Sequence, residues 1–324
     1  LAAGGITFIA LDRWVNLGEW FQVITGVLLI VTLITNPEGI AAAGHELADR
    51  WARWRAGQRA AEAPVDRPVV AAVERPAVAP VSGTALQVDR LTVRYGGVVA
   101  VNDVSLRVDP GTIVGLIGPN GAGKTSVIDA VTGFAPATGS VELAGRRLDK
   151  LAPHARVRAG LARTFQSLEL YDDLSVEENV SVAARGGRQA DRRAAVARAL
   201  ASVGIAALAD RPAGELSQGE RQLVSIARAC VADPEVLLLD EPAAGLDSEE
   251  STWLGQQIRA IGASGTALLL VDHDVNLVLS VCDHVYVLDF GAVIAEGPPD
   301  AIRADRAVAD AYLGTMHDTE AVTA

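Results

Sequence analysis

The sequence has few cysteines and few basic residues, and each shortage excludes a class of protein. Only Cys230 and Cys282 occur among the 324 residues. They lie far apart without metal-ligand spacing, so we expect each to be a small buried apolar side chain in a reducing compartment. The 28 lysines and arginines are outnumbered by 40 aspartates and glutamates, which gives a net charge of −12. This balance argues against a nucleic-acid partner, because phosphate backbones require a basic protein face.

Charged residues are also missing from the stretch between Glu19 and Glu38, which is rich in Val, Ile and Leu. A helix needs roughly 18–20 such residues to cross a bilayer. Tryptophans flank the stretch, and the arginine-rich "ADRWARWRAGQR" follows it, as at the cytoplasmic side of a membrane. We therefore predict a transmembrane helix at about residues 20–36. A buried helix of a soluble domain is the alternative, whereas a signal peptide would need a basic start and a small-residue cleavage site.

The next segment, residues 56–84, is built from Ala, Val, Pro, Arg and Glu. Its four prolines leave no helical or alternating period, so it is interpreted as a semi-rigid, polyproline-like linker. We divide the chain into residues 1–55 with the membrane helix, the linker at 56–84, a globular domain at 85–315 and a disordered tail at 316–324.

From Leu86 onward the pattern predicts an α/β fold. "LQVDRLTVRY" and "VNDVSLRVD" alternate apolar and polar residues, as half-buried antiparallel strands do. The apolar runs in "TIVGLIG", "EVLLLDEP", "TALLLVDHD" and "HVYVLDFG" are typical of parallel strands covered on both faces. The helices expected between strands are Lys124–Thr132, Arg192–Val203, Gln218–Val231, Ser248–Ile261 and Val275–Val281. Such alternation of strands and helices is typical of a sheet with helices packed against it.

The stretch "GLIGPNGAGKTS" carries the strongest chemical signal, because it fits G-x-x-x-x-G-K-[ST] between a predicted strand and a predicted helix. Glycines allow several backbone N–H groups to point at one phosphate, and the helix N-terminus adds positive potential. The lysine of this motif binds the β- and γ-phosphates, and the hydroxyl after it binds Mg²⁺. The predicted phosphate-binding residues are Gly118, Pro119, Asn120, Gly121, Ala122, Gly123, Lys124, Thr125 and Ser126.

Two carboxylates end another buried strand, in "VLLLDEP". Ligands bind beyond the carboxyl ends of parallel strands, so we predict that Asp240 binds Mg²⁺ and that Glu241 polarises the attacking water. His273, in "LLLVDHD", ends a further strand at similar depth. A structural role is open for a single histidine, but its position at a strand end favours a catalytic one.

Taken in order, these motifs resemble the ATP-binding cassette of ABC transporters. That resemblance implies a P-loop fold with a parallel core sheet, an antiparallel β subdomain and a helical subdomain. Tyr95, in "VRYGG", matches the aromatic residue that stacks on adenine, and Gln166, in "RTFQ", matches the glutamine that senses Mg²⁺ and the γ-phosphate. His273 matches the switch histidine and Asp247 the D-loop aspartate. "LSQGE" stands at the signature position, with the nucleotide-contacting residues Ser217, Gln218, Gly219 and Glu220.

Within the family, "ARTFQSLELYDDLSVEENV", "VLDFGAVIAEGPP" and "AYLG" look like the ATPase of branched-chain amino acid importers. The resemblance implies a second cassette, identical or paralogous, a permease and an extracytoplasmic solute-binding protein as partners. It also implies a cell-membrane location with the ATPase on the cytoplasmic side. The stretch "GEWFQVITGVLLIVTLITNPEGIAAAG" looks like the end of such a permease, so the hypothesis is a permease fused to its own ATPase. A simple membrane anchor is the alternative.

One departure from the family pattern is Glu220, which stands where an uncharged glutamine is usual. It leaves open a cassette that serves only as a structural partner. Importers of urea, amides or another small solute share much of the pattern and stay open as alternatives. A soluble ABC ATPase or a P-loop kinase is less favoured, because the first would lack the membrane helix and the second would lack "LSQGE".

Overall fold

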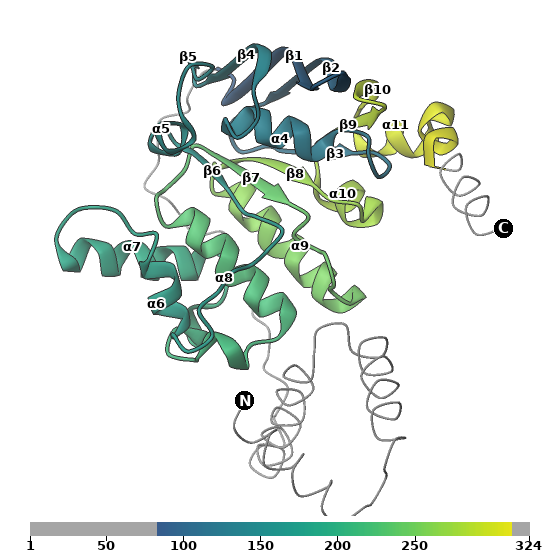
Figure 1. Ribbon diagram of the computed structural model, residues 1–324. Coiled ribbons are helices and arrows are strands. Elements are labelled where there is room, and N and C mark those ends of the chain that lie inside the picture. The colour runs from purple at the N-terminus through teal and green to yellow at the C-terminus, as the bar shows by residue number, and fades with distance from the viewer. Residues whose placement is uncertain (1–82, 313–324) are drawn as a thin grey trace, which may run out of the picture. The chain divides into compact units, whose positions relative to one another are not determined.

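The computed structural model describes residues 83–312 (Figure 1). The predicted transmembrane helix at 20–36, the tail at 316–324 and nearly all of the linker lie outside the described residues. Within residues 83–312, no helix is both long enough and apolar enough to cross a membrane.

Four strands form an antiparallel sheet in the order β2-β1-β4-β5. They are β1 (Leu86–Tyr95), β2 (Val98–Val108), β4 (Ala137–Leu143) and β5 (Arg146–Arg147). Leu86 pairs with Val108 on one side and with Leu143 on the other. The predicted alternation is confirmed for Leu86–Val93 of β1 and Val101–Val108 of β2, where the apolar residues are buried and more exposed residues separate them. The residues that join the two strands are exposed.

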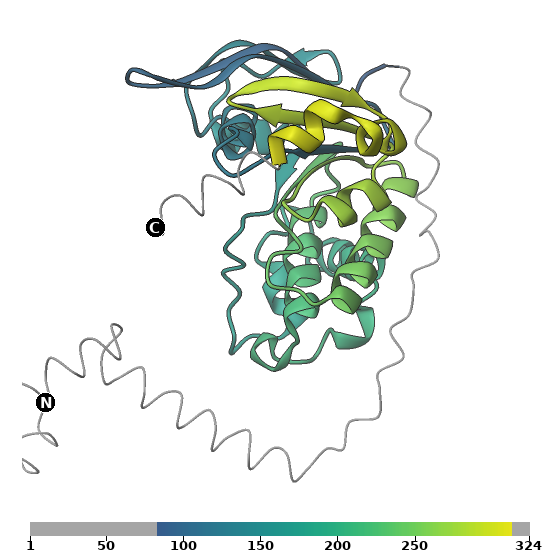
Figure 2. The ribbon, with the colours of Figure 1, turned by 90° about the vertical axis from the view of Figure 1, so that its right-hand side faces the viewer.

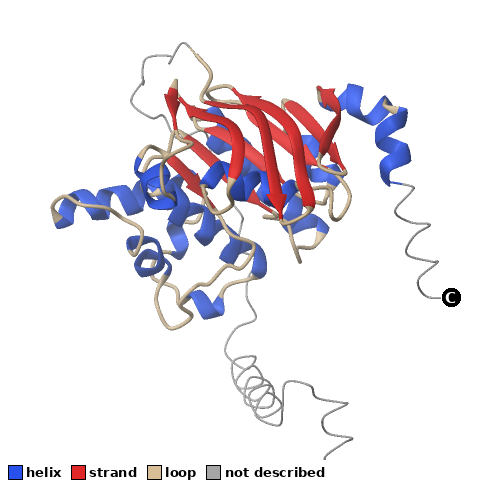
Figure 3. Cartoon of the chain, turned by 45° about the horizontal axis from the view of Figure 1, so that its top comes forward, coloured by secondary structure: helices blue, strands red, loops and turns tan. Residues whose placement is uncertain are grey.

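The core sheet has six strands in the order β10-β9-β3-β8-β7-β6. Figure 3 shows the strands in red and the helices in blue. The six strands are β3 (Ile113–Ile117), β6 (Leu161–Arg163), β7 (Val236–Asp240), β8 (Ala267–Val271), β9 (His284–Asp289) and β10 (Ala292–Gly297). All pairs are parallel except β9 with β10. Every residue of β3, β7 and β8 is buried, as their apolar runs predict. Because parallel strands share one direction, the loops that leave these strands meet at one edge of the sheet.

Helices cover both faces of the core sheet. The helices are α4 (Lys124–Thr132), α5 (Pro153–Arg158), α6 (Val176–Ser181), α7 (Gln189–Ser202), α8 (Gln218–Cys230), α9 (Ser248–Ala263), α10 (Val275–Val281) and α11 (Pro299–Ala304), with short 3-10 turns at Ala206–Leu208 and Ala213–Glu215. Of these, α6 and α7 pack against α8 and not against the sheet. Helix α4 lies between the two sheets, and α8, α9 and α10 lie on the opposite face (Figure 1). Figure 2 shows both sheets together at one end and the helical part at the other.

Two apolar cores result, one on each face of the six-stranded sheet. In β3, Val114 and Leu116 pack with α4 and the antiparallel sheet, whereas Ile113 and Ile117 pack with the helices of the other face. This follows from the period of two in a strand, which sends successive side chains to opposite faces. Both faces are covered, so the apolar run is continuous.

The predicted elements agree with the observed ones where the local pattern is strong. The ranges of α4, α10 and β1 are as predicted, whereas α7 begins three residues earlier than expected and α9 extends two residues further. Strands β4, β5, β6 and β10 and helices α5, α6 and α11 were not predicted from the sequence. The strands β5 and β6 have only two and three residues and the three helices only six, so few residues carry a period. Most residues of β4 and β10 are exposed or half-buried, so these strands lack the continuous apolar run that marks β3, β7 and β8.

Candidate active site

The phosphate loop joins β3 to α4, and two of its glycines hold positions that no other residue could take without displacement. Gly118 has a φ of 153°, and a Cβ there would stand 2.2 Å from the carbonyl oxygen of Leu288. Gly123 has a φ of 103°, and its Cβ would stand 2.4 Å from the carbonyl oxygen of Ala100. The loop is therefore packed between the β2 segment and the end of β9, which fixes its curvature.

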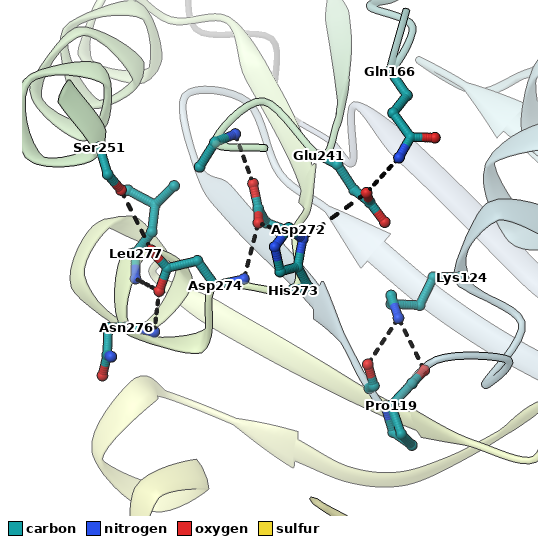
Figure 4. A network of polar contacts seen from close by, with 12 residues as sticks. Pro119, Lys124, Gln166, Glu241, Ser251, Asp272, His273, Asp274, Asn276 and Leu277 are labelled. Carbon is teal, nitrogen blue, oxygen red and sulfur yellow. Dashed lines mark hydrogen bonds and ion pairs between the residues drawn. The ribbon is translucent and has the colours of Figure 1, made fainter. Parts of the chain in front are cut away.

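Lys124 begins α4 and turns its ammonium back into this loop. Its Nζ donates to the carbonyl oxygens of Gly118 at 2.8 Å and Pro119 at 3.0 Å (Figure 4). The residue is 7% exposed. Burial lowers the pKa of Lys124, and the nearby carboxylates of Glu241, Asp272 and Asp240 oppose that shift. The result is a buried cation hydrogen-bonded to neutral carbonyl groups, an arrangement suited to an anion.

The rest of the loop presents its polar groups outward. Asn120, Gly121 and Thr125 are exposed and Ser126 is half-buried, whereas Pro119 and Ala122 are buried. A Cβ at Gly121 would meet nothing within 4 Å. The hydroxyl of Thr125 thus lies in the first turn of α4, directly after the buried lysine.

The carboxylates of "VLLLDEP" stand at the carboxyl end of β7, as expected. Glu241 has a φ of 47°, a left-handed conformation that is rare outside glycine, and its N–H donates to the carbonyl oxygen of Val271 at 2.7 Å. Nε2 of Gln166 donates to Oε2 of Glu241 at 2.8 Å. The side chain of His273 approaches the same carboxylate, with Nδ1 3.9 Å from Oε2 (Figure 4). The tertiary structure thus brings together all three residues predicted to be catalytic.

Asp272 lies beneath this group and is fully buried. Its carboxylate accepts hydrogen bonds from the N–H groups of Ala243 and Asp274, each at 2.9 Å. Burial raises the pKa of Asp272, and these two hydrogen bonds partly oppose the shift. The carboxylate joins the loop after Glu241 to the loop that carries His273.

The carboxylate of Asp240 forms an ion pair with an arginine that was not predicted from the sequence. Its Oδ2 lies 2.8 Å from Nη2 of Arg163, at the end of the neighbouring strand β6. The same guanidinium lies 2.6 Å from Oδ1 of Asp129 in α4. Arg163 therefore joins the strand that ends in the carboxylates to the helix that begins at the lysine.

The signature residues lie elsewhere, at the start of α8. Ser217 caps this helix, and its hydroxyl accepts from the N–H of Glu220 while the Glu220 carboxylate accepts from the N–H of Ser217 at 2.8 Å. The unusual glutamate is thus used in a capping box. The N–H of Gly219 donates to Oε1 of Glu250 in α9 at 3.3 Å, and Gln218 is exposed. These contacts are with α8 and α9, not with the phosphate loop.

Two predicted residues, Tyr95 and Asp247, lie at the ends of other elements. Tyr95 ends β1 with 48% of its surface exposed. Asp247 caps α9, and its Oδ1 accepts from the N–H groups of Glu249 and Glu250. Prediction from the sequence missed Arg163, Asp272 and Glu250. The first two stand inside "ARTFQ" and "LLLVDHD", next to or near the predicted Gln166 and His273.

A glycine loop after the parallel strand β3, a buried lysine and carboxylates at the end of β7, two strands away in the same sheet, define a P-loop ATPase. More narrowly, the chain belongs to the ABC transporter family of ATP-binding cassettes. The sequence profile of the ABC transporter family matches residues 101–244. A profile described as branched-chain amino acid ATP-binding cassette transporter matches residues 292–318.

Known relatives agree with this assignment. The high-affinity branched-chain amino acid transport ATP-binding protein BraF of Pseudomonas aeruginosa is 38% identical over 248 residues, 71% of this chain and 97% of BraF. The ADP conformation of MJ1267, an ATP-binding cassette of an ABC transporter, has a TM-score of 0.66 at 28% identity, over 72% of this chain and 100% of that one. The dimeric structure of MJ0796, a bacterial ABC transporter cassette, has a TM-score of 0.58 at 25% identity, over 66% and 98%. The predicted cassette fold and ATPase class are confirmed.

Proposed function

We propose that this chain hydrolyses ATP to energise the uptake of branched-chain amino acids. The observation that carries the proposal is the match of residues 292–318 to the branched-chain profile, because that segment lies outside the phosphate loop and the carboxylate strand. The name of BraF, which this chain matches over 97% of its length, supports the same substrate.

The residues fit ATP and Mg²⁺. In this proposal, Lys124 and the loop from Gly118 to Ser126 hold the phosphates, because the buried ammonium has neutral partners and an anion would balance its charge. Thr125, Asp240 and Gln166 supply the oxygen ligands that Mg²⁺ prefers. Mg²⁺, when bound, withdraws charge from the phosphates. Tyr95 is exposed and available to stack on the adenine.

Glu241 is the proposed general base. Its strained backbone and its contacts with Gln166 and His273 hold the carboxylate at the edge of the sheet, where it can orient a water and accept its proton. Gln166 and His273 position that carboxylate and contact the terminal phosphate.

A second cassette, identical or paralogous, completes each site in this proposal. Ser217, Gln218, Gly219 and Glu220 of one subunit, together with its Asp247, face the nucleotide of the other. The place of these residues at the start of α8 supports this role, since the N-terminus of a helix favours anions. The dimeric MJ0796 structure is the precedent for such pairing.

The proposal extends to the membrane partners. A permease, fused through residues 56–84 or separate, conducts the solute, and an extracytoplasmic solute-binding protein delivers it. The uncharged stretch at 20–36 is the proposed transmembrane helix, with the ATPase on the cytoplasmic side. The coding sequence before Leu1 tests the fusion, which requires further hydrophobic spans there.

Transport itself is tested by ATP-driven uptake of labelled leucine into vesicles that contain the full-length gene product with its neighbouring binding protein and cassette. We expect uptake that is lost in Glu241→Gln and inhibited by unlabelled valine but not by urea. ATP hydrolysis without leucine uptake would move the substrate to urea, amides or another small solute.

A further inference from the structure

Arg163 contacts several residues around the end of β7, and the proposed ATPase mechanism gives it no role. One end of its guanidinium lies 2.8 Å from Oδ2 of Asp240, and the other lies 2.6 Å from Oδ1 of Asp129 and 3.3 Å from the hydroxyl of Thr132. The ring of Phe165 covers the guanidinium, with 5.0 Å between Cζ and the ring centroid. The ion pairs at both ends of the planar guanidinium and the aromatic ring over it together hold the arginine in one orientation.

Stability alone is a poor account of this arrangement. The side chains of Arg163 and Asp240 are 9% and 7% exposed, and Nε of Arg163 is buried without a hydrogen-bond partner among residues 83–312. Burying an ion pair costs desolvation energy that its attraction often fails to repay, and an apolar pair would frequently serve packing as well or better. An unpaired buried N–H adds to that cost. A role of Arg163 in orienting the Asp240 carboxylate explains the arrangement better.

The geometry of the carboxylate suggests what that role is. Arg163 binds only Oδ2 of Asp240, while the N–H of the same residue donates to the hydroxyl of Thr164 at 3.2 Å. Backbone and side chain of Asp240 are thus both held by adjacent residues of one segment. Among residues 83–312, no hydrogen bond or ion pair involves the second oxygen, Oδ1, which leaves this oxygen for a metal ion. Groups that bind the outer side of a metal ligand orient it in this way.

We infer that Arg163 is a positioning residue that fixes Asp240 for Mg²⁺, an inference that rests on the proposed role of Asp240 as metal ligand. The same side chain links three parts of the site, because it belongs to the segment of Gln166, binds the end of β7, and binds α4 behind the phosphate loop. A lysine would replace it only in part, since an ammonium can contact Asp240 but lacks the planar guanidinium that packs against the ring of Phe165.

The test measures metal dependence of binding, not turnover. A fluorescent ATP analogue is titrated into the full 324-residue chain in EDTA and at increasing Mg²⁺, for the parent and for Arg163→Met and Arg163→Lys. We expect the Mg²⁺ concentration needed for half of the affinity gain to rise about 10–100-fold in Arg163→Met, with affinity in EDTA unchanged. Arg163→Lys should show a smaller rise and decides the question if the methionine variant does not fold.

Two further variants separate the possible outcomes. Asp129→Asn removes the α4 end of the bridge but keeps the contact with Asp240, so its Mg²⁺ requirement should match the parent. An equal loss in Asp129→Asn and Arg163→Met, or no loss in the arginine variants, would overturn the inference. Asp240→Asn separately tests the proposed role of Asp240 as a Mg²⁺ ligand. If it leaves the Mg²⁺ requirement unchanged, the proposed ligand role of Asp240 is what fails.

Discussion

Nε2 of Gln166 lies 2.8 Å from Oε2 of Glu241, although 75 positions separate the two residues in the sequence. The contact joins the loop after β6 to the end of the neighbouring strand β7. A movement of the glutamine segment therefore changes the surroundings of the carboxylate directly. Any partner that shifts Gln166 would alter the proposed base without touching the nucleotide.

Glu241→Gln should keep ATP binding and lose turnover. The amide preserves the size of the side chain but cannot accept a proton, and general base catalysis contributes about 10²–10⁴-fold in rate. ATP hydrolysis and nucleotide affinity are measured separately. Glu235→Gln, the same change at an exposed position just before β7, is the matched control and should hydrolyse ATP normally. Hydrolysis by Glu241→Gln at the parental rate would show that the base lies elsewhere.

Gly118→Ala should destabilise the cassette more than Gly121→Ala. The first variant combines an unfavourable φ with a methyl group 2.2 Å from the carbonyl oxygen of Leu288, and each effect costs about 1–3 kcal/mol. At Gly121 the space is open and only the positive φ of 82° opposes alanine, at about 1–2 kcal/mol. Urea unfolding midpoints of both variants provide the comparison. Equal midpoints would mean that the loop relaxes away from β9 at no cost.

Asp272→Asn should gain stability relative to the parent as the pH rises. The folded pKa of Asp272 is raised above its usual 3.8, so burial penalises the charged form. The penalty is absent below 3.8, grows as the pH rises from 3.8 toward the folded pKa and is constant above it, whereas asparagine never carries it. Loss of one acceptor for Ala243 or Asp274 adds a cost that does not vary with pH in this way.

The measurement is the difference in unfolding free energy between Asp272→Asn and the parent from pH 4 to pH 7.5. Asp103→Asn is the control for removing an exposed carboxylate. A difference for Asp272→Asn that stays constant across this range would contradict the buried-charge explanation.

Glu250→Gln should promote dimerisation driven by ATP. The Glu250 carboxylate accepts from the N–H of Gly219, at the helix end where the proposed dimer would receive a phosphate. A charge at a helix N-terminus is worth about 0.3–1 kcal/mol, so its removal should lower the ATP concentration needed for dimers about two- to fivefold. Sedimentation of the variant in a Glu241→Gln background measures this. Glu249→Gln, an exposed neighbour with the same charge change, should have no such effect.

The sequence was sufficient where one segment carries the whole signal. "GPNGAGKTS" encodes a glycine loop, a lysine and a helix start within nine residues, and α4 begins at Lys124 as predicted. The apolar runs likewise identified β3, β7 and β8 as buried strands. The match of the ordered motifs to the cassette family also needed only their identity and order.

Partners across the sheet could not be predicted in this way. Arg163 binds Asp240 because β6 lies beside β7, and strand order is decided by packing of both faces, not by either segment alone. The burial of Asp272 and the contact of Glu250 with Gly219 have the same origin, because each joins separate elements.

The sequence by itself therefore determined the local features of this protein: which strands are buried, where the phosphate loop lies and which carboxylates end a strand. Only the tertiary structure decided which side chains meet, and thus that Gln166 holds Glu241 and that Arg163 holds Asp240. The physical reason is the distance along the sequence over which each effect acts. Propensity and periodicity act over a few neighbouring residues, whereas a hydrogen bond across 75 positions exists only after the sheet has assembled.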